Sequence, residues 1–263
     1  MPKFNDLDLN NGNWKKYEDI LTDSLWIINE RDKSGKHSNF YHGNFVPQIP
    51  YQLIKRYTKK GGWVLDLFLG SGTTAIECEK LERNIIGIDL KEELVARAKE
   101  LIASDKIQKH FGLGDSGSEE TKKDIQKILK HHKKTGVDLV LLHPPYFDII
   151  KFSEDKKDLS NAGNLQDFLN MFHNVLQNSF ELLKSGGYMG VVIGDKYANS
   201  EWIPLGFQCM NEAQKVGFKL KSIIVKNMEG NRGKIGSGGI WRYRALNSDY
   251  YIFKHEYILI FKK

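Results

Sequence analysis

Two glycines and a carboxylate mark residues 66–74, DLFLGSGTT, where an apolar run ends and a helical pattern begins. Gly70 and Gly72 permit a tight turn and let a ligand approach the main chain closely. Asp89 follows the next apolar run, and a carboxylate in that position can accept hydrogen bonds from both hydroxyls of a ribose. The turn lacks the lysine of a P-loop and the GxGxxG spacing, so it favours a nucleoside without a pyrophosphate. A turn that serves only close packing is the alternative.

A second group of residues that could take part in a reaction lies at the end of another apolar run: His143, Pro144, Pro145 and Tyr146. The prolines cannot continue a sheet interior, so they end the strand, and their restricted φ makes the main chain rigid. Tyr146 then lies at the carboxyl edge of the sheet, where open α/β sheets bind ligands. A ring beside rigid acceptors suits a flipped nucleic-acid base. A proline turn capped by core aromatic residues is the alternative.

Both motifs need elements that hold them at one edge of a sheet. The order strand, glycine turn, helix, strand predicts a βαβ unit in a parallel sheet. We expect strands at residues 63–70, 84–90, 137–143, 188–195, 219–227 and 255–263. We expect helices at residues 50–58, 71–82, 91–102, 121–134, 164–184 and 204–216. Ser185, Gly186 and Gly187 are expected to end the helix over residues 164–184.

Together, DLFLGSGTT and HPPY resemble the cofactor motif and the catalytic tetrad of the DNA amino-methyltransferases, which modify adenine N6 or cytosine N4. The resemblance extends over roughly residues 24–263 and includes HGNFVPQIPYQLIKRYT, which is similar to the segment over the methionine end of the cofactor. It implies a Rossmann-like three-layer α/β sandwich with a mostly parallel sheet and a C-terminal antiparallel hairpin. It also implies S-adenosylmethionine as cofactor, bound by Asp66, Phe68, Gly70, Gly72, Thr73, Asp89 and Asp115.

By the same resemblance, His143, Pro144, Pro145 and Tyr146 are catalytic, and the exocyclic nitrogen of the stacked base attacks the methyl group in line. Proximity and orientation supply much of the rate. His143 departs from the family pattern, which has Asp or Asn in most adenine enzymes and often Ser in cytosine-N4 enzymes. A neutral imidazole can accept a hydrogen bond and an imidazolium cannot, so activity should fall at acidic pH. The departure leaves the target base open, and also a structural role for His143 with Asp148 assisting instead.

Positive charge gathers at the C-terminal end of the sequence. The net charge is +6, and residues 219–263 contain ten Lys or Arg against three acids. A basic segment on a nearly neutral body is typical of a surface that contacts phosphates. Residues 227–250 are expected to form a long loop and are the candidate target-recognition element; a solvated loop is the alternative. The residues assigned to nucleic-acid binding are Arg232, Lys234, Trp241, Arg242 and Arg244.

Length and composition favour a single domain over residues 1–263. The resemblance implies that it is a methyltransferase domain with residues 1–50 as an N-terminal extension and cofactor lid. Trp14 and Trp26 are the expected anchors of this extension. The sequence has no apolar stretch long enough to cross a membrane and no secretory signal, so we expect a cytoplasmic protein. The two cysteines lie far apart and no His or Cys spacing matches a metal site, so neither a disulfide framework nor a metal is predicted.

The leading hypothesis is therefore a methyltransferase that modifies adenine N6 or cytosine N4 in duplex DNA with the target base flipped out. A homodimer and a cognate restriction nuclease are compatible with it. Three alternatives stay open: an RNA base amino-methyltransferase, a non-catalytic nucleic-acid-binding subunit, and a small-molecule methyltransferase. No appended RNA-binding domain is visible in the sequence, which favours DNA. His255 and Glu256, at the start of the last strand, are assigned to packing or turn chemistry rather than to catalysis.

Overall fold

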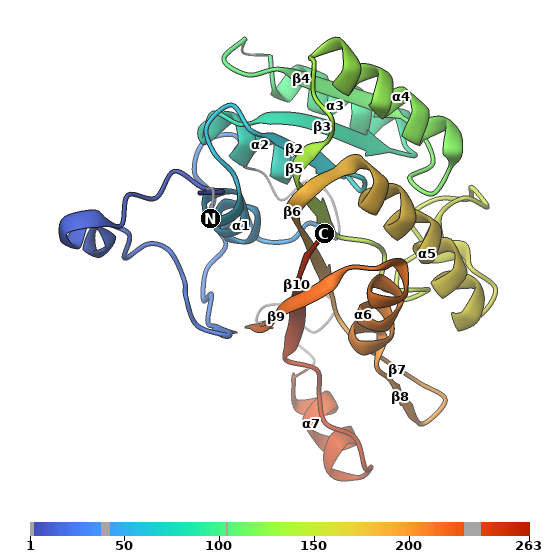
Figure 1. Cartoon of the computed structure of the whole chain (residues 1–263). Coiled ribbons are helices and arrows are strands. Elements are labelled where there is room, and N and C mark those ends of the chain that lie inside the picture. Colours follow the sequence, from blue (N-terminus) through green and yellow to red (C-terminus); the bar gives the residue numbers. More distant parts are fainter. Residues whose placement is uncertain (1–2, 38–42, 104, 229–237) are drawn as a thin grey trace.

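One large sheet runs through the computed structural model, which describes residues 3–37, 43–103, 105–228 and 238–263 (Figure 1). It has eight strands in the order β1-β9-β10-β6-β5-β2-β3-β4. These are β1 (Leu25–Trp26), β2 (Trp63–Asp66), β3 (Asn84–Asp89), β4 (Lys109–Leu113), β5 (Val137–Leu142), β6 (Leu183–Ile193), β9 (Lys219–Asn227) and β10 (His255–Lys262). Neighbouring strands are parallel except where β10 pairs with β6 and β9. The predicted mostly parallel sheet and antiparallel C-terminal pair are confirmed.

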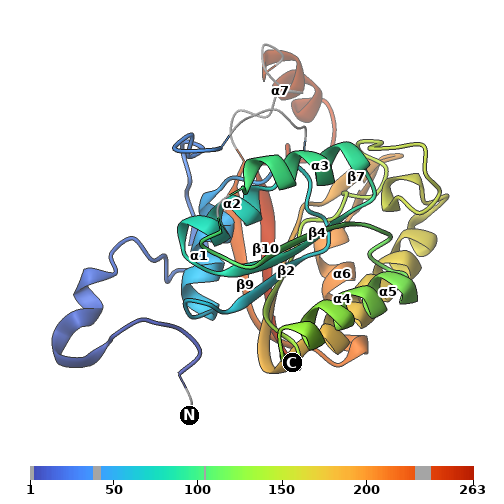
Figure 2. The same cartoon turned by 90° about the horizontal axis from the view of Figure 1, so that it is seen from above.

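Helices cover both faces of this sheet, which gives the expected three-layer sandwich (Figure 2). One face carries α1 (Gln48–Tyr57), α2 (Thr73–Lys80) and α3 (Glu92–Leu101). The other carries α4 (Glu119–His131), α5 (Leu165–Leu182) and α6 (Leu205–Val216). Because helices cover both faces, the central strands carry apolar side chains on both sides; all four residues of β2 are buried.

Each face of the sheet has its own apolar core. Leu53 of α1 packs with Val64 and Ile85 on one side, and Phe168 and Phe172 of α5 fill the other. Burying a side chain of this size contributes about 1.5–3 kcal/mol. These two cores hold the strand ends, and therefore both sequence motifs, at one edge of the sheet.

The sequence prediction of a turn at Ser185-Gly186-Gly187 is wrong. Helix α5 ends at Leu182, and the three residues lie inside β6, where Gly186 takes a φ of +75°. Leu183 is buried and pairs with Val137 of β5, so burial of this side chain draws the chain directly from helix into strand. The sequence analysis also missed β4, a half-exposed edge strand without an apolar run, and the short hairpin of β7 (Lys196–Ala198) and β8 (Glu201–Ile203).

The segment expected to be a loop over residues 227–250 contains a helix, α7 (Gly238–Leu246). The glycine-rich start of α7 and its mixed aromatic and basic residues give no periodic apolar stripe, so its sequence carries little helical signal. Figures 1 and 2 both show α7 projecting from the body of the molecule next to β10.

The N-terminal extension lies partly against α1 and partly away from the body (Figure 1). The amide of Asn5 donates to the carbonyl of Arg56 at 2.9 Å, which ties the start of the described chain to α1. A 3-10 helix, η1 (Asn10–Lys16), follows and carries Trp14, which is 60% exposed. Trp26 is buried, so of the two expected anchors only Trp26 is one. No helix in the described part of the chain is long and apolar enough to cross a membrane.

Candidate active site

The glycine turn joins β2 to α2 at the carboxyl edge of the sheet. Gly70 and Gly72 have φ values of +51° and +83°, in the left-handed region that glycine adopts without strain. The N–H of Leu69 donates to the carbonyl of Ile88 at 3.0 Å, which ties the turn to β3. The main chain of the turn therefore lies close to the end of β3, whose last residue is Asp89.

Asp89, on the neighbouring strand β3, stabilises the turn through hydrogen bonds. Its carboxylate accepts hydrogen bonds from the N–H of Gly70 at 2.8 Å and from the N–H of Lys91 at 3.0 Å. Burial raises the pKa of Asp89, and these two main-chain hydrogen bonds oppose that rise. Each carboxylate oxygen has a second lone pair, so Asp89 can also accept hydrogen bonds from the hydroxyls of a ligand.

Asp66 supports the turn from inside the core. It is 1% exposed, and its Oδ1 accepts a hydrogen bond from the N–H of Phe68 at 2.9 Å. Burial raises the pKa of Asp66 to about 6. Asp66 does not line the pocket described below, so its role toward a cofactor stays a prediction.

The second motif forms a strained turn at the end of β5. Directly after the tetrad, Phe147 has a φ of +56°, which is unfavourable for a bulky side chain and is held by burial of its ring against Phe168. The ring of Tyr146 lies on the main chain of Gly194, after β6: a Cβ placed on Gly194 would meet Cε2 of Tyr146 at 2.7 Å. Only glycine at position 194 leaves the ring in this place.

Tyr146 belongs to a continuous chain of four polar side chains that are joined by hydrogen bonds. Lys226 Nζ donates to Glu256 Oε1 at 3.0 Å, and the hydroxyl of Tyr146 donates to Glu256 Oε2 at 2.8 Å. His143 Nε2 lies 3.2 Å from the Tyr146 oxygen. Lys226 and Glu256 are buried. Burial lowers the pKa of His143 to about 4 and raises the pKa of Tyr146 well above its usual value, so both are neutral at pH 7.

The segment before α1 covers this site from one side. The pocket wall includes Gly43, Asn44, Phe45 and Val46, and the ring of Phe45 packs edge-on against His143 with centroids 4.9 Å apart. These residues therefore form part of the pocket wall, and their role as a lid over the cofactor stays a prediction.

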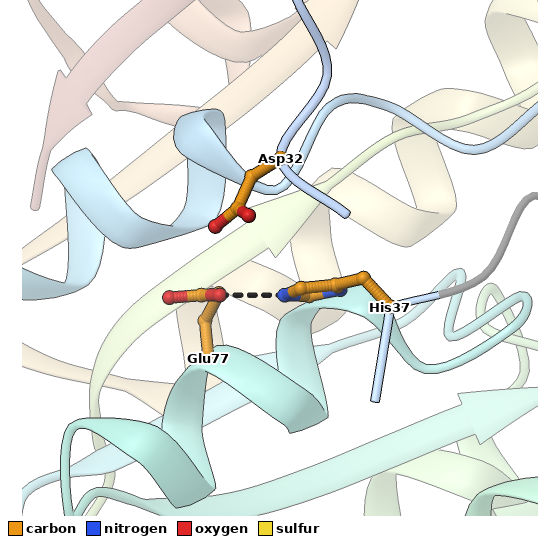
Figure 3. A group of neighbouring side chains, drawn as sticks. All are labelled: Asp32, His37 and Glu77. Carbon is orange, nitrogen blue, oxygen red and sulfur yellow. Dashed lines mark hydrogen bonds and ion pairs between the residues drawn. The ribbon is translucent and has the colours of Figure 1, made fainter. Parts of the chain in front are cut away.

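A buried polar cluster holds the preceding residues against α2 (Figure 3). His37 Nε2 lies 2.7 Å from Glu77 Oε1, and Asp32 points at the same place. These are residue types that can ligate a metal, and their ligand atoms lie within 4.8 Å of one another. However, the ammonium of Lys80 lies 3.7 Å from both Asp32 and Glu77 and supplies a positive charge there. We therefore assign the cluster to an ion-pair network that anchors the segment before α1 to α2.

One pocket of about 1330 Å³ joins these parts. The predicted site residues that line it are Phe68, Gly70, Thr73, Asp89, Asp115, His143, Pro144, Pro145, Tyr146, Trp241 and Arg244. Asp66, Gly72 and Arg242 do not line it, and Arg232 and Lys234 lie outside the described residues. Asp148, considered as a substitute for His143, is exposed outside the pocket and pairs with Lys196. Two pocket-lining residues of α7 form one unit, because the guanidinium of Arg244 stacks over the ring of Trp241 at 5.3 Å.

Sequence reasoning missed Lys226 and Glu256 and assigned Glu256 to packing or turn chemistry. Both line the pocket. The available signal was a charged residue at a buried end of each of two apolar strands, IIVKN and HEYILIF. Buried Lys and Glu side chains are rare unless they are paired, so two such residues in neighbouring strands point to a functional pair.

The sequence of the chain matches the DNA methylase family (N6_N4_Mtase) over residues 3–100 and 137–263. This protein belongs to the DNA methylase family. The two matched stretches include the glycine turn, Asp89, the His143–Tyr146 segment and the strands that carry Lys226 and Glu256. Membership of this family also identifies the cofactor as S-adenosylmethionine.

Several type II methyltransferases are similar to parts of this DNA methylase. M.MjaII of Methanocaldococcus jannaschii is 32% identical over 117 residues, which are 44% of this chain and 18% of the relative. M.SmaI of Serratia marcescens is 38% identical over 30% of this chain and 26% of its own length. M2.DpnII of Streptococcus pneumoniae is 34% identical over 37% of this chain and 34% of its own length. The chain thus spans about a fifth to a third of the length of these relatives.

Solved structures share the fold at low sequence identity. TrmN from Thermus thermophilus aligns over 84% of this chain and 50% of its own, with a TM-score of 0.54 and 19% identity. An S-adenosylmethionine-dependent methyltransferase from Methanosarcina mazei aligns over 80% of this chain and 96% of its own, with a TM-score of 0.51 and 14% identity. The Rossmann-like methyltransferase fold expected from the sequence is confirmed.

Proposed function

We propose that this protein transfers a methyl group from S-adenosylmethionine to the exocyclic amine of adenine (N6) or cytosine (N4) in DNA. The observation that carries the proposal is that one pocket is lined by the glycine turn, the His143–Tyr146 segment and α7. Its volume of about 1330 Å³ exceeds the range of roughly 300–1,000 Å³ that is usual for one small ligand. A cofactor and a flipped base can therefore occupy it side by side. The type II DNA methyltransferases among the relatives support DNA as the substrate.

The residues around the glycine turn fit the cofactor. The left-handed glycines leave the main chain open to a ligand, and Asp89 has lone pairs for the ribose hydroxyls. Asp115 lies in the same wall and is proposed to contact the adenine, while Phe68 and Thr73 line the space next to the turn. When bound, the cofactor would supply an electrophilic methyl group. The amine nitrogen would form a bond to this methyl carbon and lose one proton, while the electrons of the broken carbon–sulfur bond would remain on sulfur.

The residues around the proline turn fit the target base. The ring of Tyr146 offers a stacking face, and it cannot turn away because Gly194 and Glu256 hold its ring and its hydroxyl. His143 and the rigid main chain of Pro144 and Pro145 offer acceptors for the amino hydrogens. Accepting these hydrogens raises the electron density on the amine nitrogen and orients its lone pair, which raises its reactivity toward the methyl group.

Helix α7 is proposed to contact the nucleic acid at the mouth of the pocket. Arg244 can pair with a phosphate, and Trp241 can stack on a base or fill the gap left by the flipped one. Arg242 lies on the same helix outside the pocket lining, so we assign it to the backbone of the duplex. Arg232 and Lys234 retain the phosphate-binding role expected from the sequence.

The decisive experiment measures transfer of labelled methyl groups from S-adenosylmethionine to duplex DNA and, in parallel, to bulk tRNA. Nucleoside mass analysis of the products identifies the base. Label in N6-methyladenine or N4-methylcytosine of the DNA is the expected result and also decides between the two bases. Label confined to tRNA would replace the substrate. Cofactor binding without transfer to either polymer would contradict the proposal and favour a non-catalytic subunit.

A further inference from the structure

The buried pair of Lys226 and Glu256 lies directly behind the proposed stacking tyrosine. Their side chains are 7% and 9% exposed, and Glu256 is the acceptor for the Tyr146 hydroxyl at 2.8 Å. Removing two charges from water is costly, so a buried ion pair contributes little net stability. The position of this pair is therefore better explained by what it does to Tyr146 and, through it, to His143.

Charge determines the direction of every hydrogen bond in this chain. A carboxylate beside an ammonium has no proton to give, so Glu256 can only accept. Tyr146 has a single hydroxyl hydrogen and directs it to Glu256, so its oxygen can only accept from His143. His143 must then carry its ring proton on Nε2. In the neutral imidazole this leaves an unshared electron pair on Nδ1.

The Nδ1 atom of His143 belongs to a ring that lines the pocket. Among the described residues this atom has no hydrogen-bond partner, whereas Nε2 lies beside the Tyr146 oxygen. The ring itself forms part of the pocket wall, next to Tyr146. An acceptor nitrogen without a partner in the described chain is thus carried by the wall of the pocket in which the proposed base stacks.

We infer that Glu256 and Lys226 are positioning residues that set the tautomer of His143 through Tyr146, so that Nδ1 accepts a hydrogen bond from the target amine. The inference rests on the proposed function. With the opposite tautomer, His143 would present an N–H to the amino hydrogens, and two donors cannot bond. The chain of hydrogen bonds therefore lets an imidazole replace the carboxylate, amide or hydroxyl that stands first in the tetrads of the family. The proton that the amine loses leaves through this acceptor to solvent.

The first test is the tautomer itself, which needs neither substrate nor turnover. Protein labelled with ¹⁵N-histidine is measured by NMR at pH 7, and the His143 signals are identified by their loss in His143→Asn. We expect the protonated nitrogen to be Nε2, and we expect Tyr146→Phe to convert the pair of signals into those of a tautomer mixture. Protonation of Nδ1 in the unchanged protein would overturn the inference, whatever the enzyme proves to methylate.

The second test is a double-mutant cycle on methyl transfer. We expect Glu256→Gln to lower kcat by about 100-fold, the size of a lost acid–base contribution, with the KM for DNA unchanged. In the His143→Asn background the acceptor is an amide oxygen that needs no tautomer control, so adding Glu256→Gln should change kcat less than about threefold. An equal loss in both backgrounds would overturn the inference and reduce Glu256 to a support of the fold.

Two controls accompany the cycle. Glu256→Gln leaves Lys226 as an unpaired buried charge, so the combination Lys226→Met with Glu256→Met, which has no strong acceptor for the Tyr146 hydroxyl, is measured as well. It should show the same loss of kcat and the same sensitivity to His143→Asn if the tautomer is the cause. Glu201→Gln, on the exposed strand β8, is the matched change and should leave kcat and the NMR signals unaltered.

Discussion

The hydroxyl of Tyr146 donates to the carboxylate of Glu256 at 2.8 Å across 110 positions of sequence. Tyr146 follows the parallel strand β5, whereas Glu256 is the second residue of β10. Because β10 runs antiparallel to β6, its first residues lie at the edge where the parallel strands end. The antiparallel strand β10 thus places the carboxylate of Glu256, from near the C-terminal end of the sequence, in the site. Lys226 lies opposite it at the paired position on β9.

Replacement of Asp89 tests the cofactor half of the site. We expect Asp89→Ala to weaken S-adenosylmethionine binding by at least about tenfold, since hydrogen bonds to a charged group contribute about 1.5–3 kcal/mol each. Asp89→Asn keeps one acceptor oxygen and should lose less. Titration calorimetry measures both, with thermal unfolding as a control because Asp89 also satisfies the N–H groups of Gly70 and Lys91. Unchanged affinity would remove Asp89 from the ribose.

Removal of the Tyr146 ring tests the base half. Tyr146→Ala should abolish turnover, because the base loses its stacking face, while the affinity for S-adenosylmethionine stays within about twofold of the original. Single-turnover transfer and calorimetry on the same preparations separate the two effects. Retained turnover would refute the stacking role.

The contact between Gly194 and the ring of Tyr146 predicts that a single added methyl group at position 194 lowers turnover. In Gly194→Ala the new methyl group would lie 2.7 Å from Cε2 of Tyr146, so the ring must move. Overpacking of this kind costs about 1–3 kcal/mol, and the displaced ring should lower kcat more than tenfold. Gly239→Ala, where nothing lies within 4 Å, is the matched control and should behave like the unchanged protein. Equal activity of the two variants would show that the ring position does not matter.

The pH dependence of turnover follows from the half-buried imidazole of His143. Burial lowers the pKa of His143 to about 4, so we expect the fall in kcat at acidic pH to have its midpoint near pH 4 rather than near the ordinary value of 6.5. A pH–rate profile on a single-turnover timescale measures it. A midpoint near 6.5 that disappears in His143→Asn would contradict the neutral, half-buried histidine described above.

The same group links stability to pH with a definite sign. Because the folded pKa lies below the unfolded one, the unfolded chain takes up the proton first as the pH falls. The contribution of His143 to the free energy of unfolding is therefore complete above about pH 6.5 and decreases between pH 6.5 and 4, by roughly 3 kcal/mol. Denaturant titrations of the protein and of His143→Asn should diverge in this interval, and parallel curves would count against the shift.

Helix α7 is the testable part of the nucleic-acid surface. Arg244→Ala should weaken binding to duplex DNA and reduce the slope of log affinity against log salt by about 1, as expected for one lost phosphate contact. Arg242→Ala, two positions away and outside the pocket lining, removes the other proposed backbone contact of α7, so it should also reduce this slope by about 1 but leave transfer at saturating DNA unchanged. Salt-dependent anisotropy measurements provide the slopes. Indistinguishable slopes for Arg244→Ala and the unchanged protein would exclude the contact.

Local sequence determined most of the fold and the two main motifs. Continuous apolar runs identified β2, β3 and β5, and the glycine and proline turns identified where those strands end, because these signals act between near neighbours. It did not determine how α5 passes into β6, where burial of Leu183 overrides a glycine turn, nor the edge strand β4, which has no apolar run. Helix α7 was also missed, since its sequence has no apolar stripe.

The tertiary structure alone decided how the tetrad is completed. The sequence by itself presented His143 as a departure with two unresolved interpretations, since nothing within several residues of it supplies a partner other than Tyr146. Glu256 and Lys226 reach the site only because β9 and β10 insert beside β6 with opposite direction, a pairing between segments far apart in the chain. Whether a charged residue in a strand has a structural or a functional role depends on the side chain that it faces. Strand order and direction determine which side chain that is.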